Sequence, residues 1–296
     1  MKNILQKLIF VILLVFLTAS CNSGSNDVID DTPTPLDAAV YLNVSYGTNA
    51  QQIYDIYLPE GRTKENTKVI VLVHGGGWTS GDKADMTNFV VYLQENFPDY
   101  AIVNTNYILA EIGIPGTPAF PNQFLDLESV LFQLKNQEDE LQIKAEFGII
   151  GTSAGAHIAL MYDYSYDVTN QVKFVADIVG PTDFLDPFYT DDSNFAFALQ
   201  ALVDEGAYPE GTNYAQAVSP LHQVTAISSP TILFYGNQDP LVPLSNGVNL
   251  EAALNNVGVL NSFTVYNGGH GDNWSAADFL DLQVKLRTFI QTYLPL

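Results

Sequence analysis

Residues 147–162 read FGIIGTSAGAHIALMY, and this stretch decides the fold. Its first four residues form a short apolar run, which is typical of a parallel strand buried on both faces. Residues 151–155 form a G-x-S-x-G motif, and the helical run AHIALMY follows. A serine on such a tight strand-to-helix turn is forced outward, where its hydroxyl can attack a substrate. The motif and its setting therefore predict that Ser153 is a nucleophile.

Similar apolar runs recur along the chain, and helical patterns separate most of them. The runs cover residues 69–73, 101–104, 174–179, 231–235 and 263–266. The expected helices follow Asp82, Pro121 and Ser153 and cover residues 245–257 and 276–293. Two alternating stretches come earlier, at 40–46 and 53–58, and predict an antiparallel hairpin. We therefore predict an α/β fold with a mostly parallel central sheet, helices on both faces and an N-terminal antiparallel hairpin. In such sheets the reactive groups gather outside the carboxyl ends of the strands.

A second motif, HGGGW at residues 74–78, directly follows the buried run VIVLV. Its three glycines leave backbone N–H groups free to point at a ligand. The tetrahedral intermediate of acyl transfer carries an oxyanion that needs such donors. The N–H groups of Gly76 and Gly77, together with that of Ala154, are the candidate oxyanion hole. His74 is interpreted as a hydrogen-bonding residue of this loop rather than as a base.

The serine needs a base, and the chain offers three further histidines. His157 lies one helical turn after Ser153, so its side chain is expected to pack beside the helix. His222 lies in SPLHQV and is interpreted as a loop residue. His270 lies in GGHGDNW, just beyond the strand FTVY, on a loop that can reach over the nucleophile. We therefore predict that His270 is the base.

The base in turn needs a carboxylate that holds its tautomer and stabilises the imidazolium. Asp239, in GNQDPLVP, follows the strand TILFY. The resulting order of Ser153, Asp239 and His270 is the order found in α/β-hydrolases. The rival acids are Asp183, which follows the run FVADIV, and Asp272, which is close in sequence to the base.

HGGGW, GTSAGAH, GNQDPLVP and GGHG together resemble the α/β-hydrolase superfamily from about residue 40 to the end. They are similar to the esterase/lipase branch with an HGGGW oxyanion loop, which includes hormone-sensitive-lipase-like and acetylxylan or feruloyl esterase-like enzymes. The resemblance implies hydrolysis of carboxylic esters without a metal or other cofactor. Two alternatives stay open: a serine peptidase or amidase with the same triad, and a non-catalytic surface binding module on a hydrolase scaffold.

Residues 1–21 have the pattern of a secretory signal: an early pair of lysines, ten apolar residues, and small residues before the cysteine. The apolar run is too short to span a bilayer, which needs about 20 residues. The segment resembles a bacterial lipoprotein signal, in which Cys21 becomes the lipidated first residue. This predicts a secreted, lipid-anchored protein of the cell envelope. Residues 22–37 are polar and contain proline, which predicts a flexible tether before a hydrolase domain at 38–296.

Charge and aromatic content bear on the partners. The chain carries 33 acidic and 11 basic side chains, a net charge of −22. Such a charge repels phosphate backbones and argues against nucleic acid as a partner.

Aromatic residues are frequent between 181 and 218, which predicts a small lid-like insertion. The expected substrate is a small-molecule or polysaccharide-linked ester, either short-chain or of the acetyl or feruloyl type.

Overall fold

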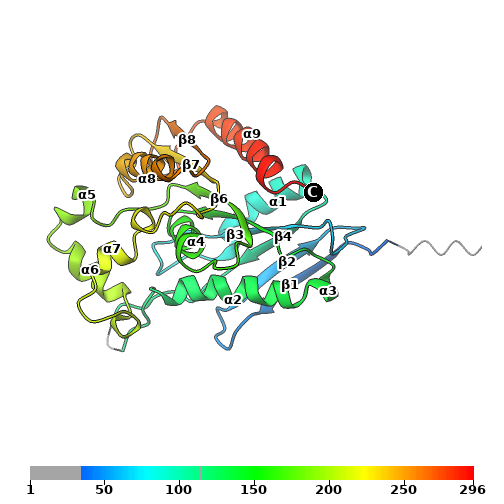
Figure 1. The fold of residues 1–296 in the computed structure, drawn as a ribbon, viewed down its shortest axis with the longest axis horizontal. Coiled ribbons are helices and arrows are strands. Elements are labelled where there is room, and N and C mark those ends of the chain that lie inside the picture. The colour runs from blue at the N-terminus through cyan, green and yellow to red at the C-terminus, as the bar shows by residue number, and fades with distance from the viewer. Residues whose placement is uncertain (1–34, 114) are drawn as a thin grey trace, which may run out of the picture. The chain divides into compact units, whose positions relative to one another are not determined.

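A single eight-stranded sheet organises residues 35–113 and 115–296, which are the residues described by this computed structural model. The strands follow the spatial order β1-β2-β4-β3-β5-β6-β7-β8 (Figure 1). Their bounds are β1 (Ala39–Ser45), β2 (Ile53–Leu58), β3 (Val69–Val73), β4 (Ala101–Thr105), β5 (Phe147–Thr152), β6 (Val172–Ile178), β7 (Thr231–Gly236) and β8 (Asn261–Tyr266). The predicted signal peptide, Cys21 and the tether up to residue 34 lie outside the described residues.

The helices connect these strands and lie on both faces of the sheet. They are η1 (Lys83–Met86), α1 (Thr87–Asn96), α2 (Asn122–Asn136), α3 (Glu138–Leu141), α4 (Ala154–Ser165), α5 (Pro187–Thr190), α6 (Phe195–Leu202), η2 (Glu205–Ala207), α7 (Tyr214–Ala217), η3 (Pro220–His222), α8 (Leu244–Val257) and α9 (Ala276–Tyr293). Among the described residues, none of these helices is both long enough and apolar enough to cross a membrane.

The predicted α/β fold and its N-terminal hairpin are confirmed. β1 pairs with β2 in antiparallel fashion, and β2 also runs antiparallel to β4. From β3 to β8 all neighbouring strands are parallel. The helix expected after Asp82 begins as the 3₁₀ turn η1, in which the Asp82 side chain accepts a hydrogen bond from the N–H of Ala84. The C-terminal helix covers the expected residues 276–293.

Two apolar layers explain why the central strands are apolar without interruption. Within β3, the side chains of Val69, Val71 and Val73 join the core beneath α2, α4 and α8. Those of Ile70 and Leu72 join the core beneath α1 and α9. Because both faces are covered, every residue of β3 is buried, as expected for a parallel strand between two helical layers.

The strand order reverses beside β3, and this determines where a site can form. β3 is followed in the chain by β4 on one side of it, whereas β5 lies on its other side. The connections after β3 and β5 therefore leave in opposite directions, and the carboxyl ends of strands at such a reversal are where ligand sites form in open α/β sheets. The register pairs Val73 with Gly151, so the HGGGW loop and the turn at Ser153 begin side by side.

Glycine is required where these two segments touch. A Cβ atom on Gly155 would lie 2.2 Å from the carbonyl oxygen of Val73 and 2.4 Å from that of His74. A Cβ atom on Gly151 would lie 2.5 Å from the backbone nitrogen of Ala156. Since backbone atoms are the obstacle in both cases, the small residues on either side of Ser153 allow α4 to approach the end of β3.

Candidate active site

Ser153 occupies a sharp turn between β5 and α4. Its φ of 52° and ψ of −120° lie in a region that non-glycine residues rarely adopt. The surrounding structure holds this conformation, because the Ser153 N–H donates to the carbonyl oxygen of Ile178 at 2.8 Å and α4 begins at the next residue. The Ser153 side chain makes no capping bond to the helix. Its hydroxyl is therefore available for an external partner.

The structure brings the three predicted triad residues together. The Ser153 hydroxyl lies 2.8 Å from His270 Nε2, and His270 Nδ1 lies 2.6 Å from Asp239 Oδ2. A carboxylate oxygen accepts hydrogen bonds, so the imidazole carries its proton on Nδ1 and offers Nε2 to the hydroxyl. This arrangement lets His270 take a proton from Ser153, as nucleophilic activation requires.

Asp239 is held so that it faces the imidazole. Its side chain is fully buried, and its second oxygen accepts hydrogen bonds from the N–H groups of Leu241 and Val242 at 2.8 and 3.0 Å. The rival acid Asp183 lies instead 3.4 Å from Nε2 of His222, and Asp272 is exposed. Asp239 is therefore the acid that the fold presents to His270.

The HGGGW loop adopts a conformation that only glycine permits easily. Gly76 and Gly77 have φ values of +120° and +57°, and a Cβ atom on Gly76 would lie 2.0 Å from the carbonyl oxygen of Ser80. Across the described ranges, no protein acceptor pairs with the backbone N–H groups of Gly76, Gly77 or Ala154. All three predicted oxyanion-hole donors thus remain available to a ligand.

Two side chains fix the orientation of the Gly75–Gly76 peptide. His74 Nδ1 donates to the carbonyl oxygen of Gly75 at 2.7 Å. The Tyr107 hydroxyl lies between two carbonyl oxygens of this loop, 3.1 Å from that of His74 and 3.4 Å from that of Gly75. In a trans peptide the C=O and the next N–H point in opposite directions. Holding the Gly75 carbonyl therefore aims the Gly76 N–H to the other side of the loop.

His74 performs this task as a neutral imidazole. Its ring stacks on Tyr107 with centroids 4.3 Å apart, and burial lowers the pKa of His74. The sequence predicted a hydrogen-bonding role for His74, but its contact with Tyr107 could not be predicted. No local pattern marks this pair, because the two residues lie on loops that follow different strands.

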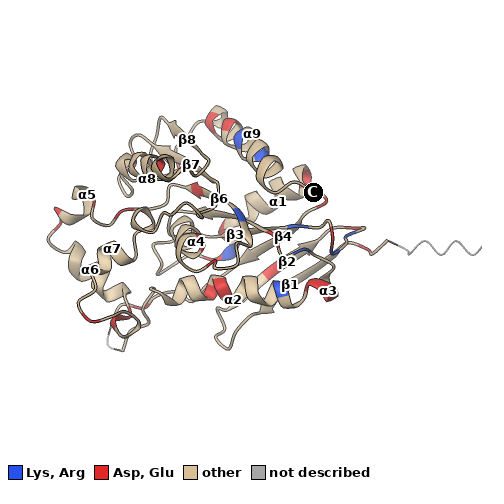
Figure 2. Cartoon of the chain, in the orientation of Figure 1, with Lys and Arg blue, Asp and Glu red and all other residues tan. Residues whose placement is uncertain are grey.

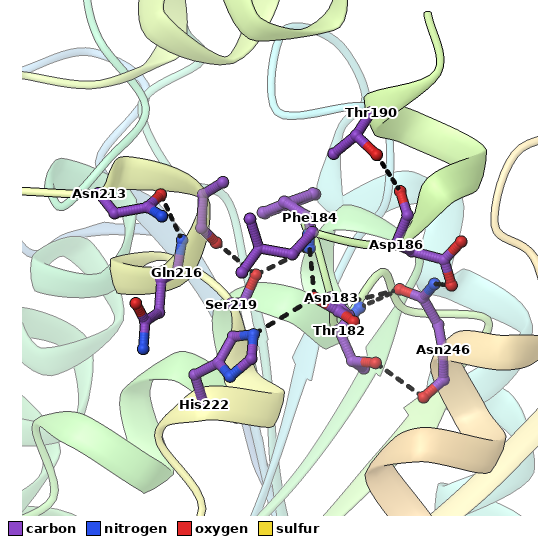
Figure 3. A network of polar contacts seen from close by, with 12 residues as sticks. Thr182, Asp183, Phe184, Asp186, Thr190, Asn213, Gln216, Ser219, His222 and Asn246 are labelled. Carbon is purple, nitrogen blue, oxygen red and sulfur yellow. Dashed lines mark hydrogen bonds and ion pairs between the residues drawn. The ribbon is translucent and has the colours of Figure 1, made fainter.

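A network of hydrogen bonds anchors both ends of the 181–218 segment (Figure 3). Near its start, Asn246 Oδ1 on α8 accepts from the N–H groups of Thr182 and Asp183 at 2.7 and 2.9 Å. Beyond its end, the Ser219 hydroxyl accepts from the Phe184 N–H at 2.8 Å. The segment between these anchors contains α5, α6, η2 and α7.

This segment carries a mixed aromatic and polar hollow of about 460 Å³. Phe184, Phe195 and Tyr214 contribute aromatic side chains to its wall, and Asp192 and Asn213 contribute polar ones. The Phe184 ring also lies 5.8 Å from the ring of Trp78 in the HGGGW loop. The wall of the hollow is thereby in contact with the candidate site.

Charge is distributed unevenly around the site. Between Lys173 and Lys285 the sequence contains neither lysine nor arginine, and Figure 2 shows only acidic charges on the 181–218 segment. The loops after β6, β7 and β8 all fall in this interval. No cluster of three or more His, Cys, Asp or Glu side chains within the described ranges is arranged to hold a metal ion.

A buried carboxyl group lies on the strand next to the one that leads into the turn at Ser153. Asp177 in β6 is paired with Gly151 in register. Its Oδ1 accepts a hydrogen bond from the Gly180 N–H, and its Oδ2 shares one with the Tyr235 hydroxyl, both at 2.7 Å. Burial raises the pKa of Asp177 to about 7, against an ordinary value of 3.8. The folded chain therefore keeps this proton at pH values where the unfolded chain has released it.

We predict that Asp177→Asn changes the pH dependence of stability. In the wild type, this group contributes less free energy of unfolding as pH rises from about 4 to 7, because only the unfolded chain ionises readily there. An amide does not titrate, so the free energy of unfolding of the variant, relative to that of the wild type, should rise by about 3 kcal/mol from pH 5 to pH 8. Urea unfolding of both proteins at the two pH values measures the difference. If the two proteins differ in free energy of unfolding by the same amount at pH 5 and at pH 8, Asp177 is not held protonated in the folded chain.

Most of the described chain is similar to known proteins. The model of the BD-FAE family matches residues 54–254. Esterase LipC of Mycobacterium tuberculosis (strain ATCC 25618 / H37Rv) is 21% identical over 213 residues, which are 68% of this chain and 51% of that protein. The chain thus spans about half the length of this curated relative.

Solved structures share the fold. A truncated form of a carbohydrate esterase from gut microbiota has a TM-score of 0.66 at 20% identity, over 84% of this chain and 96% of that chain. Thermogutta terrifontis esterase 2, phosphoramylated by tabun, has a TM-score of 0.64 at 18% identity, over 87% of this chain and 95% of that chain. At these identities the likeness concerns the fold.

Proposed function

The chain belongs to the BD-FAE family of α/β-hydrolase esterases, and from this premise we propose that it is a serine carboxylic ester hydrolase. The observation that carries the proposal is the continuous chain of contacts from the Ser153 hydroxyl through His270 to the buried Asp239. The backbone N–H groups of Gly76, Gly77 and Ala154, which pair with no acceptor among residues 35–113 and 115–296, support it further.

The proposed reaction proceeds through an acyl-enzyme. His270 Nε2 takes the proton of Ser153 while Oγ bonds to the ester carbonyl carbon. The carbonyl oxygen becomes an oxyanion that accepts hydrogen bonds from the three amides. As the intermediate collapses, the C–O bond to the alcohol breaks and His270 returns the proton to the leaving oxygen. Water then attacks the acyl-enzyme by the same route and releases the acid.

We propose that the substrate is an uncharged ester, either short-chain or attached to a carbohydrate through an acetyl or feruloyl group. The absence of lysine and arginine between residues 173 and 285 supports an uncharged substrate, because an anionic group would meet only acidic side chains around these loops. The name of the gut carbohydrate esterase supports a carbohydrate-linked ester. The aromatic and polar wall of the hollow near Phe184 suits a ring that carries hydroxyl groups.

Replacing the nucleophile tests the mechanism. We predict that Ser153→Ala lowers kcat for p-nitrophenyl acetate by at least about 10⁴-fold, because the triad acts as a unit. Asp239→Asn should lower kcat by a similarly large factor, because the amide favours the tautomer of His270 that cannot accept the Ser153 proton. Ser165→Ala, at an exposed position on the same helix α4, is the matched control and should keep the wild-type rate. A Ser153→Ala protein with full activity would end the proposal.

A panel of substrates separates esterase from amidase. We predict that the wild type hydrolyses acetyl and feruloyl sugar esters and releases little product from peptide amides with the same acyl groups. Faster cleavage of the amides would favour a serine peptidase or amidase. Reaction with neither class, together with no labelling of Ser153 by a fluorophosphonate, would favour a binding module.

We also propose that the protein is a lipoprotein of the bacterial cell envelope, anchored through Cys21. The signal pattern at residues 1–21 supports this proposal. Expression with a labelled fatty acid is expected to label the wild type and not Cys21→Ala. Equal labelling of the two proteins would contradict it.

A further inference from the structure

His157 is a fully buried imidazole that the proposed reaction does not use. It lies on α4, one turn beyond Ser153, with an exposed fraction of 0%. Four aromatic rings surround it, with centroid distances between 5.1 and 5.5 Å; they belong to Trp78, Phe120, Phe124 and Phe184. A polar ring in such a place is costly unless both of its nitrogens are satisfied.

Both nitrogens of His157 have partners, and the partners fix its tautomer. The indole Nε1–H of Trp78 lies 3.2 Å from Nδ1, and an indole can only donate. Nδ1 is therefore the acceptor, and Nε2–H donates to the carbonyl oxygen of Val218 at 2.7 Å. Burial lowers the pKa of His157 to about 4, so the ring stays neutral and keeps its acceptor near neutral pH.

These two partners belong to segments that lie far apart in the sequence. Trp78 directly follows Gly77 in the HGGGW loop and has a positive φ of 64°. Its carbonyl oxygen accepts from the Ala110 N–H and from Gln123 Nε2. Val218 is the C-cap of α7 and ends the 181–218 segment. The imidazole thus joins the oxyanion loop to the end of this segment.

We propose that His157 is a positioning residue, whose neutral imidazole holds Trp78 and thereby the amides of the HGGGW loop in place against the 181–218 segment. The inference rests on the proposed ester hydrolysis. Hydrogen-bond donors for an oxyanion must be held within about 0.5 Å of their productive positions. If Nδ1 is lost, the indole N–H of the half-buried Trp78 loses its acceptor, and Trp78 must turn to find another. Gly77 is its neighbour in the chain and would move with it.

Two amide substitutions separate the two bonds. In His157→Asn the side-chain oxygen takes the place of Nδ1 and keeps the acceptor for Trp78. In His157→Gln the side-chain nitrogen takes the place of Nε2 and keeps the donor to Val218, while the acceptor for Trp78 is lost. Trp78→Phe removes the indole donor and preserves an aromatic ring in the cluster.

We predict that His157→Gln and Trp78→Phe each lower kcat for p-nitrophenyl acetate about 10-fold, while KM stays within about twofold. The double variant should be no slower than either single variant, because both remove the same bond. His157→Asn should keep kcat within about threefold of the wild type, because it retains the hydrogen bond to Trp78. It should raise KM, because it loses the hydrogen bond to Val218.

Tyr164→Phe is the matched control. Tyr164 is also buried on α4, and its hydroxyl bonds to the Thr231 hydroxyl at 2.9 Å, away from the HGGGW loop. This variant should lower the urea midpoint without changing kcat. If His157→Gln behaves in the same way, losing stability with an unchanged kcat, His157 is merely structural and the proposal fails. Additive losses in the double variant would also overturn it.

A spectroscopic readout tests the link without relying on turnover. The chain has two tryptophans, so a ¹⁵N–¹H spectrum contains two indole signals, and Trp78→Phe assigns one of them. The assigned signal should move in His157→Gln and stay near its wild-type position in His157→Asn. An indole signal that keeps its position in both variants would contradict the hydrogen bond between Trp78 and His157. Failure of the wild type to hydrolyse any ester would instead refute the proposed function and leave this result intact.

Discussion

The close contact between the turn at Ser153 and the end of β3 is the constraint on which the site depends. Gly155 allows α4 to approach the carbonyl oxygens of Val73 and His74, and this approach places the Ala154 amide beside the HGGGW loop. The positive φ of Ser153 is maintained because β5 and α4 are both fixed by the sheet and its helical layers. Local strain at Ser153 is thus balanced by packing elsewhere.

Buried polar side chains then refine the geometry that packing establishes. His74 and Tyr107 hold the Gly75 carbonyl, and His157 connects Trp78 with Val218. Asp177 and Tyr235 form a hydrogen bond in the strands beneath the turn. Asp177, Tyr235 and His157 are removed from water and hydrogen-bonded within the protein, where hydrogen bonds hold a unique arrangement most firmly. Ser153, Asp239 and His270 themselves lie at the carboxyl ends of the strands.

The sequence predicts the parts of this site that local patterns encode. Ser153, Asp239 and His270 each follow a strand of the parallel part of the sheet, and parallel strands bring their carboxyl ends to one edge, so their meeting could be anticipated. The start of the C-terminal helix also follows from a local pattern, because Ser275 forms a capping box with Asp278. The 3₁₀ start of the helix after Asp82 was not predicted, since short 3₁₀ turns share the capping signals of α-helices.

Contacts between distant segments could not be predicted from one sequence. The bond from Trp78 to His157 joins positions 79 residues apart, and the pairing of Asp183 with His222 requires the whole 181–218 segment to fold back. Neither contact leaves a periodic or motif-like signal. His157 packs within α4 as the sequence suggested, whereas His222, expected in a loop, is the last residue of the 3₁₀ turn η3. The partners of both histidines could not be identified from the sequence.

The central claim is that Ser153 and the three amides act on the same carbonyl group. A crystal structure of the protein after reaction with a fluorophosphonate tests it most directly. The account predicts a covalent bond from Ser153 Oγ to phosphorus, with a phosphoryl oxygen within about 3.1 Å of the Gly76, Gly77 and Ala154 nitrogens. Attachment at another residue, or an oxygen that contacts none of these amides, would contradict it.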